Sequence, residues 1–308
     1  LIGVVWSWRL NRQRRAKNYE RGLKMIPMLI HLPPSTDDIQ GGGRDERDVT
    51  NEALSQAQVM YSIIASTVTK GLKSRIFGQR HMSFEIIAAE GLIKYYAVVP
   101  AVIVETVKQA VISAYPSARL EEIEPDSIFS EEVTTDQVAG GEMTLKKSFV
   151  YPISTYEDSQ RDASLGILNA MSVTKVGEGI AVQILLRPTD GGWTKKSEEW
   201  VQNIKSGKKV AEAGKKAANK IVLLVKDFVQ AFWRPPDAHE KYEKDPLTNL
   251  QQEEIAAIEN KTKHPGFETL IRVVASSKSK DRSEAMLGGV VAAFAQFDSQ
   301  NFNGFQYD

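Results

Sequence analysis

The sequence contains no cysteine, and its four histidines (His31, His81, His239 and His264) lie far apart. The absence of cysteine excludes a disulfide framework, a thiolate metal cage and a cysteine nucleophile, and it fits a chain in a reducing compartment. Scattered single histidines argue against a dedicated zinc or iron site. We therefore expect neither a bound metal nor a cofactor.

The sequence also lacks an excess of charge of either sign. Its 39 basic and 39 acidic residues give a formal net charge of zero, which excludes a uniformly basic protein that coats nucleic acid. Its 308 residues are 42% apolar, enough for sizeable cores, so disorder throughout is excluded as well. At about 150 residues per domain, this length predicts roughly two domains.

Sequence motifs typical of several enzyme classes are missing. There is no G-x-x-x-x-G-K-[ST] loop for nucleotide phosphates, no G-x-S-x-G nucleophile elbow and no H-E-x-x-H zinc motif. The nearest candidates, Gly207-Lys208-Lys209 and Gly214-Lys215-Lys216, lack the first glycine at the required spacing and the hydroxyl residue after lysine. We therefore predict that this chain has no catalytic residues of its own.

The first residues are apolar and end in a dense basic cluster. Leu1 to Trp8 is interrupted by Gly3 and Ser7, and residues 1–24 hold seven basic residues against one acidic residue. Eight residues cannot cross a bilayer, which needs about 20, but an apolar segment that ends in tryptophan and is followed by arginines is typical of the cytoplasmic end of a membrane helix. The alternative is an amphipathic helix on a soluble protein. The predicted membrane or lipid contacts are Trp6, Trp8, Arg9, Arg12, Arg14, Arg15 and Lys17.

The next part of the chain predicts a linker and a first α+β subdomain. Pro33-Pro34 and Gly41-Gly42-Gly43 assign residues 25–49 to a linker. Residues 50–125 then predict a helix whose apolar face carries Leu54, Ala57, Tyr61, Ile64 and Val68, and two strands that meet at Glu90-Gly91. A second helix, with Val104, Val107, Val111 and Ala114 on one face, and a strand at 118–123 follow. Such a unit packs helices on an antiparallel sheet.

An acidic segment separates this unit from the second half. Residues 121–142 contain eight acidic residues and no basic one, and Gly140-Gly141 is typical of a loop, so residues 126–142 are assigned to an exposed connector. Residues 143–308 predict a second α+β subdomain that begins with a strand from Met143 to Thr155. It continues with a short apolar strand at 180–186, an alternating strand at 267–275 and a helical insertion at 194–263. Its closing helix places Met286, Val290, Phe294 and Phe297 on one face.

The predicted fold class is therefore α+β: two ferredoxin-like α/β halves with inserted long helices, preceded by the end of a membrane helix. A weak similarity between residues 83–87 and 266–270, each at the start of a strand, also suggests two halves of similar construction.

A lysine-rich stretch lies inside the insertion. Residues 205–226 hold seven lysines against one glutamate, and apolar residues follow up to Trp233. This helix could cover its own sheet with the lysines in water, lie on a membrane or a partner, or bind nucleic acid. The candidate contacts are Lys208, Lys209, Lys215, Lys216, Phe228, Phe232 and Trp233.

Three segments together resemble a known family. They are residues 82–118 (beginning Met82-Ser83-Phe84-Glu85), residues 182–188 with Trp193, and residues 265–275 with Phe294 and Phe297. They are similar to the membrane-proximal region that precedes the motor domain in bacterial ATPases of the type IV secretion and conjugation kind. The resemblance covers most of residues 25–308, and its motifs are structural, so it transfers no catalytic residue.

The resemblance implies a position and a set of partners. In that family a membrane segment comes first, then this α+β region, then a RecA-like motor. The expected partners are therefore the inner membrane, a downstream motor domain of the same polypeptide and further copies of the chain, with nucleic acid reached through the motor. The bulk of the chain would be cytoplasmic, and any ATPase activity would belong to the longer parent protein. The alternative is a soluble nucleic-acid-binding module that uses the lysine-rich helix.

Overall fold

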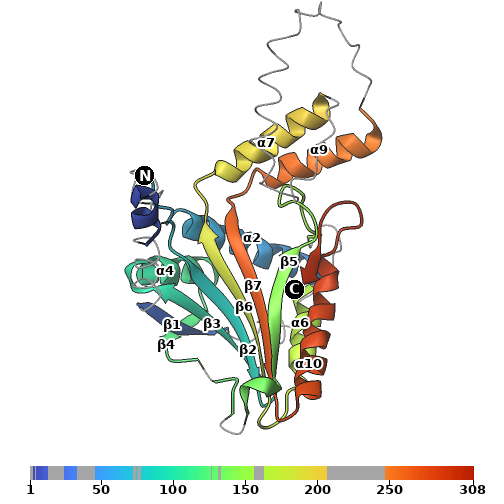
Figure 1. Cartoon of the computed structure of the whole chain (residues 1–308). Helices are drawn as coiled ribbons and strands as arrows, with labels where there is room; N and C mark the ends of the chain where they lie inside the picture. Colours follow the sequence, from blue (N-terminus) through green and yellow to red (C-terminus); the bar gives the residue numbers. More distant parts are fainter. Residues whose placement is uncertain are drawn as a thin grey trace, which may run out of the picture.

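The computed structural model describes residue 3 and residues 5–12, 24–32, 46–71, 74, 78–125, 127–130, 133–155, 163–206 and 247–308 (Figure 1). The first half contains, in chain order, β1 (Met25–His31), α2 (Glu46–Ala65), β2 (Met82–Ala89), β3 (Leu92–Pro100), α4 (Val104–Ala114) and β4 (Arg119–Glu122). The second half contains β5 (Val138–Leu145), α6 (Ala163–Met171), β6 (Gly179–Pro188), α7 (Gly192–Lys205), α9 (Asn249–Lys261), β7 (Phe267–Ser276), α10 (Lys280–Ala293) and β8 (Phe305–Tyr307).

All eight strands belong to one sheet in the order β4-β1-β3-β2-β6-β7-β5-β8, and every neighbouring pair is antiparallel. Each half has the element order β-α-β-β-α-β, once the helices between β6 and β7 are set aside as an insertion. Within each half, the first and third strands are central and the second and fourth are outer. The predicted α+β class with two ferredoxin-like halves is confirmed. The halves join edge to edge through β2 and β6.

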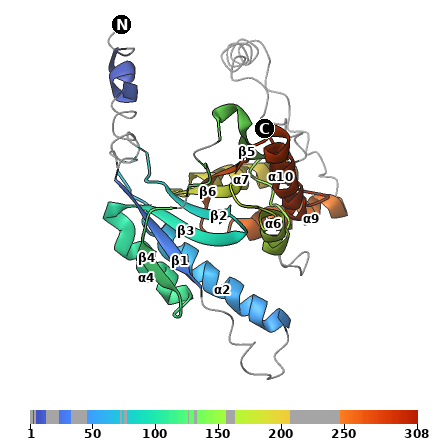
Figure 2. The same ribbon diagram turned by 90° about the horizontal axis from the view of Figure 1, so that it is seen from below.

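The strand register shows which side chains share a face. Side chains alternate along a strand, so Met82 on β2 and Leu186, opposite it on β6, point to the same side of the sheet. Both belong to the core under α2 and α4, whereas Ala88 and its partner Ile180, farther along the same strands, belong to the core under α6 and α10. The four helices α2, α4, α6 and α10 therefore pack on one face of the sheet. Figure 2, which views the sheet roughly along its strands, shows the same arrangement.

Local sequence explains several elements. Glu90 and Gly91 both have positive φ angles, 53° and 79°, which is the backbone of a tight type I′ hairpin turn between β2 and β3. The predicted inner face of α4 is confirmed, because Val104, Val107, Val111 and Ala114 are all buried. The closing helix α10 likewise buries Met286 and Val290, and Phe294 in the turn after it is buried as well.

The predicted face of the first long helix is partly wrong. Ile64 is fully buried as expected, and the partly exposed ring of Tyr61 packs edge-on against Phe84 and Phe267 of the sheet, but Leu54 is 40% exposed. Met60, which the prediction left out, is buried instead. The inward stripe is displaced around the helix because α2 packs against α4 as well as over the sheet.

Three predicted boundaries differ from the structure. Residues 25–31, assigned to a linker, form β1. The backbone of this strand pairs with β3 on one side and with β4 on the other. Residues 138–142, assigned to the acidic connector, begin β5. Gly140-Gly141 suggested a loop, but a glycine at 141 allows the ring of Tyr307 on β8 to lie against the strand. The strand expected to start at Met143 therefore starts at Val138.

The similarity between residues 83–87 and 266–270 does not join equivalent strands. Residues 83–87 lie in β2, the second strand of its half, and residues 267–270 lie in β7, the third strand of the other half. The two halves do have the same element order, but this short sequence match does not reflect it, because it aligns strands at different positions in the two halves.

Candidate interaction surfaces

The structure brings some of the predicted contact residues together and does not describe others. Trp6, Trp8, Arg9 and Arg12 lie on one helical segment, residues 5–12. Arg14, Arg15 and Lys17 lie outside the described residues. So do all the candidates in the lysine-rich stretch: Lys208, Lys209, Lys215, Lys216, Phe228, Phe232 and Trp233.

The helix of residues 5–12 exposes large aromatic side chains. Trp6 is 65% exposed and Trp8 is 59% exposed. The guanidinium carbon of Arg12 lies 5.3 Å from the centre of the Trp8 ring, a cation–π contact one turn along the helix. In Figure 2 this helix, near the label N, projects away from the sheet and its helices.

No helix within the described part of the chain is long and apolar enough to cross a bilayer.

The sheet face opposite the helices carries a row of polar side chains across four neighbouring strands, β2, β6, β7 and β5. Glu85 on β2 lies opposite Gln183 on β6, Gln183 opposite Arg272 on β7, and Arg272 opposite Glu142 on β5. Gln183 Nε2 donates a hydrogen bond to Glu85 Oε1 at 2.7 Å, and Ser83 Oγ donates to the same oxygen at 2.6 Å. Arg272 Nε donates to Glu142 Oε1 at 3.1 Å. These bonds hold the row as two neighbouring groups, Ser83 with Glu85 and Gln183, and Arg272 with Glu142.

Apolar side chains flank this polar row on the same face. They alternate with the core-facing residues of each strand, and they are half-buried rather than covered by the four packed helices: Pro27, Leu29, Val98, Ala181, Leu185, Leu270 and Val274. Tyr96, next to Glu85 across the sheet, is fully buried on this face. A face with apolar flanks around a hydrogen-bonded centre has the composition of a protein contact surface. We call it the helix-free sheet face.

The two inserted helices form a separate unit above the ends of β6 and β7 (Figure 1). Their core contains Val201 and Ile204 from α7, Ile255 and Ile258 from α9, and Val150 from the segment after β5. The helix α9 begins with a capping box, in which Thr248 and Gln251 bond reciprocally.

A hydrogen-bond network fastens this helical pair to the body. Tyr151 OH donates to Glu254 Oε1 at 2.6 Å and accepts from Trp200 Nε1 at 3.2 Å. Lys261 Nζ donates to the carbonyl oxygens of Phe149 and Tyr151, and burial lowers the pKa of this lysine. The network therefore holds in place both ends of the segment that carries the lysine-rich stretch.

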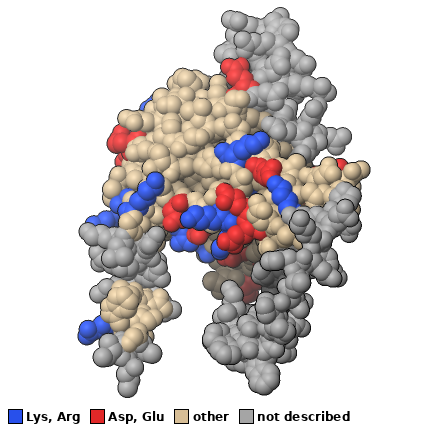
Figure 3. Space-filling view, turned by 90° about the horizontal axis from the view of Figure 1, so that it is seen from above, with Lys and Arg blue, Asp and Glu red and all other residues tan. Residues whose placement is uncertain are grey.

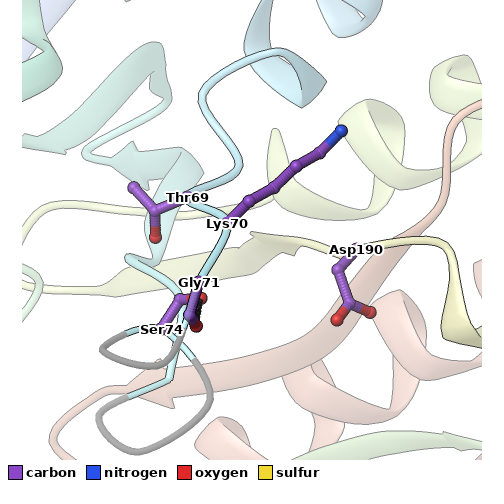
Figure 4. Close-up of a pocket in the computed structure, with 5 residues that line it drawn as sticks. All are labelled: Thr69, Lys70, Gly71, Ser74 and Asp190. Carbon is purple, nitrogen blue, oxygen red and sulfur yellow. Dashed lines mark hydrogen bonds between the residues drawn. The ribbon is translucent and has the colours of Figure 1, made fainter.

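A small hollow of about 230 Å³ lies between the segment after α2 and the β6–α7 loop, lined by Thr69, Lys70, Gly71, Ser74 and Asp190 (Figure 4). Gln79 fixes one wall, because it accepts bonds from the backbone N–H and hydroxyl of Thr69 and donates to its carbonyl. Lys70 extends away from Thr69 and Ser74, so the charges in the hollow do not converge on one point. The hollow shows no catalytic arrangement.

Within the described residues, no cluster of three or more His, Asp and Glu side chains could hold a metal ion. On the face seen in Figure 3, which looks down on the molecule from above, the Lys and Arg side chains of the described residues lie among Asp and Glu side chains.

The sequence prediction did not include the polar row of the helix-free sheet face. Alternation along each strand could have indicated that Glu85, Gln183 and Arg272 face away from the core. Their meeting in one row depends on the pairing of β2 with β6 and of β6 with β7, which join parts of the chain about 90 residues apart.

A family model described as "Domain of unknown function (DUF8128)" matches residues 47–307. No curated protein matches the sequence.

Proposed function

Because the chain belongs to the DUF8128 family, whose description states no activity, we propose from its own residues that it is a non-catalytic membrane-anchoring and assembly module. In this proposal it serves a translocation ATPase of the type IV secretion and conjugation kind, at the cytoplasmic face of the inner membrane. The observation that carries the proposal is the helix of residues 5–12, with the exposed indoles of Trp6 and Trp8 followed by arginines. Tryptophan and arginine in this order are enriched where a helix leaves the bilayer.

The construction of the sheet supports the assembly part of the proposal. Both edge strands are short, four residues in β4 and three in β8, and β4 carries Arg119, Glu121 and Glu122. Short charged edges discourage the addition of further strands. The helix-free sheet face is therefore the better surface for self-association, and we assign the contact between copies to it.

The anchoring is tested with the natural full-length polypeptide, fractionated after cell lysis without detergent. We expect it in the membrane pellet, resistant to extraction by high salt and by alkaline carbonate. Recovery in the soluble fraction would refute the anchoring.

The assembly is tested with paired leucine variants. Leu185 and Leu270 are half-buried on the helix-free sheet face, whereas Leu165 on α6 is 55% exposed on the helical side. We expect the unsubstituted protein to sediment as an oligomer. Leu185→Lys and Leu270→Lys should each lower the mass of the sedimenting species, and the control Leu165→Lys should leave that mass unchanged. A monomeric parent protein at all concentrations would refute assembly through this face.

The second candidate function is nucleic-acid binding through the lysine-rich stretch, which carries seven lysines against one glutamate over residues 205–226. Phosphate contacts weaken steeply as salt rises. Two results would favour this function. The affinity for single-stranded DNA should fall steeply between about 50 and 200 mM salt, the range over which phosphate contacts are usually compared. Binding should also be lost when four lysines are changed to glutamine: Lys208, Lys209, Lys215 and Lys216.

A further inference from the structure

Among the described residues, the helix of residues 5–12 shows no buried side. Seven of its eight residues are exposed, and Leu10 alone is half-buried. An amphipathic helix of a soluble domain covers its core with one apolar face, so at least one stripe of its residues is buried. This segment has no such stripe, and its apolar residues Val5, Trp6 and Trp8 all face solvent.

The two tryptophans point in nearly opposite directions. Successive residues of an α-helix are about 100° apart around its axis, so Trp6 and Trp8 are separated by about 200°. A helix that lies flat in the membrane surface buries one side and leaves the other in water. In that orientation one of the two indoles would enter the lipid and the other would point away from it.

An orientation along the membrane normal removes this conflict. Both indoles then lie at nearly the same depth, because two residues advance about 3 Å along the axis. Arg9 and Arg12 follow toward the cytoplasm, and Arg12 lies on the same side as Trp8, held by the contact with its ring. A guanidinium has five N–H donors, so Arg12 can contact the ring and still donate to a phosphate.

We propose that residues 5–12 pass through the headgroup layer of a phospholipid bilayer end-on, with Trp6 and Trp8 at its apolar boundary and Arg9 and Arg12 at the lipid phosphates. This inference rests on the membrane anchoring proposed above and specifies its geometry and its ligand, the phospholipid phosphodiester. It corresponds to the first of the two interpretations that the sequence left open, the cytoplasmic end of a membrane helix.

The test uses the absence of cysteine from the chain. Single cysteines are placed in the full chain at Val5, Ser7, Leu10 and Asn11, which preserves both tryptophans and both arginines, and each is labelled with a nitroxide. The protein is reconstituted with vesicles of phosphatidylglycerol and phosphatidylcholine, and the depth of each label is measured from its accessibility to oxygen and to a water-soluble nickel complex. A label at Lys195, exposed on α7, is the control for full contact with water.

The end-on orientation predicts a steady change of depth with residue number, about 1.5 Å per residue. A flat helix instead gives depths that rise and fall with a period of 3.6 residues, and this result would overturn the inference while leaving the anchoring intact. Labels that all match the Lys195 control would overturn both the inference and the membrane anchoring.

Discussion

The two halves of the sheet have the same element order but differ at one connection. In the first half, β2 and β3 are joined by the tight turn at Glu90-Gly91. In the second half, the equivalent strands β6 and β7 are separated by residues 189–266, which include α7 and α9. The strands still pair along their whole length, from Gly179 with Ser276 to Pro188 with Phe267. A hairpin in this fold therefore accepts a large insertion at its turn without loss of register.

This difference separates two structural units of the molecule. The insertion has its own core and is fastened to the body through Tyr151 and Lys261 rather than through the sheet. The halves, in contrast, share strand pairing at β2 and β6 and a common helical side. We expect the sheet to behave as one cooperative unit and the insertion as an addition to it.

The largest effect is expected at the seam between the halves. Met82 is fully buried at the start of β2, opposite Leu186 of β6. Met82→Ala should lower the free energy of unfolding by about 3 kcal/mol, the usual result of removing a buried methionine side chain. Urea unfolding with hydrogen exchange on peptides from each half would measure it, and both halves should lose protection together.

Leu92→Ala is the control for this prediction, because Leu92 is 67% exposed on the neighbouring strand. If Met82→Ala weakened protection in residues 25–122 alone, the halves would be independent domains and the description of one cooperative sheet would be wrong.

The next effect distinguishes the first strands of the two halves. At the middle of β1, Met28 is fully buried, but β5 has Gly141 in its middle, where an added Cβ would lie 2.5 Å from the carbonyl oxygen of Asp308 and 2.7 Å from the Tyr307 ring. Gly141→Ala should destabilise the protein by about 1–3 kcal/mol, as overpacking does. Hydrogen exchange should increase mainly at β8. Unchanged exchange there would show that β8 moves to accommodate the added methyl group without a loss of stability.

A half-buried ion pair in the second half gives the third prediction. Arg282 Nη2 lies 2.9 Å from Glu178 Oε2, and the hydrogen bond from Arg282 lowers the pKa of Glu178 below its ordinary value of 4.5. Because the unfolded chain binds this proton at higher pH than the folded chain, the stabilisation is present above about pH 4.5 and is lost as pH falls below it. The backbone N–H of Glu90 bonds the carbonyl of Glu178, so the pair also supports the hairpin of the first half.

Glu178→Gln should therefore lower the free energy of unfolding at pH 7 by about 1.5 kcal/mol, a value typical of a charged hydrogen bond. The difference from the parent protein should shrink as the pH is lowered from 5 to 3 in urea unfolding experiments, a range that spans the usual glutamate pKa of about 4.3. Glu284→Gln, at an exposed glutamate of α10, is the control. A difference that stayed constant with pH would mean that the pair acts through packing rather than charge.

Much of this fold follows from the sequence, and particular residues show where prediction stops. The spacing of Val104, Val107 and Val111 predicted the inner face of α4, and Glu90-Gly91 predicted the hairpin, because both signals are local. β1 and the start of β5 were missed. Pro27 in β1 and Gly140-Gly141 in β5 resemble loop signals, and their pairing partners lie far away in the chain. Local propensity does not report such long-range pairing.

The same limit applies to the candidate surfaces. Trp6, Trp8, Arg9 and Arg12 were predicted from composition and order along the chain, which is information that a short segment carries by itself. The polar row of Glu85, Gln183 and Arg272 was not predicted, because no local pattern says which strands become neighbours. Surfaces built from one segment are visible in a sequence, and surfaces built by a sheet become visible with its topology.

The smallest effect is the counterpart of the Gly141 prediction and has the opposite sign. Gly288 lies in the middle of α10, and a Cβ added there would meet no atom of the described chain within 4 Å. Glycine in a helix interior is less favourable than alanine by about 0.8–1.0 kcal/mol, so Gly288→Ala should stabilise the protein by up to about 1 kcal/mol. Urea unfolding at two protein concentrations would measure the change. A second outcome would bear on the proposed oligomer. If Gly288→Ala raised the stability at low protein concentration but dissociated that oligomer, the outer face of α10 would belong to the contact between copies. The assignment of this contact to the helix-free sheet face would then be wrong.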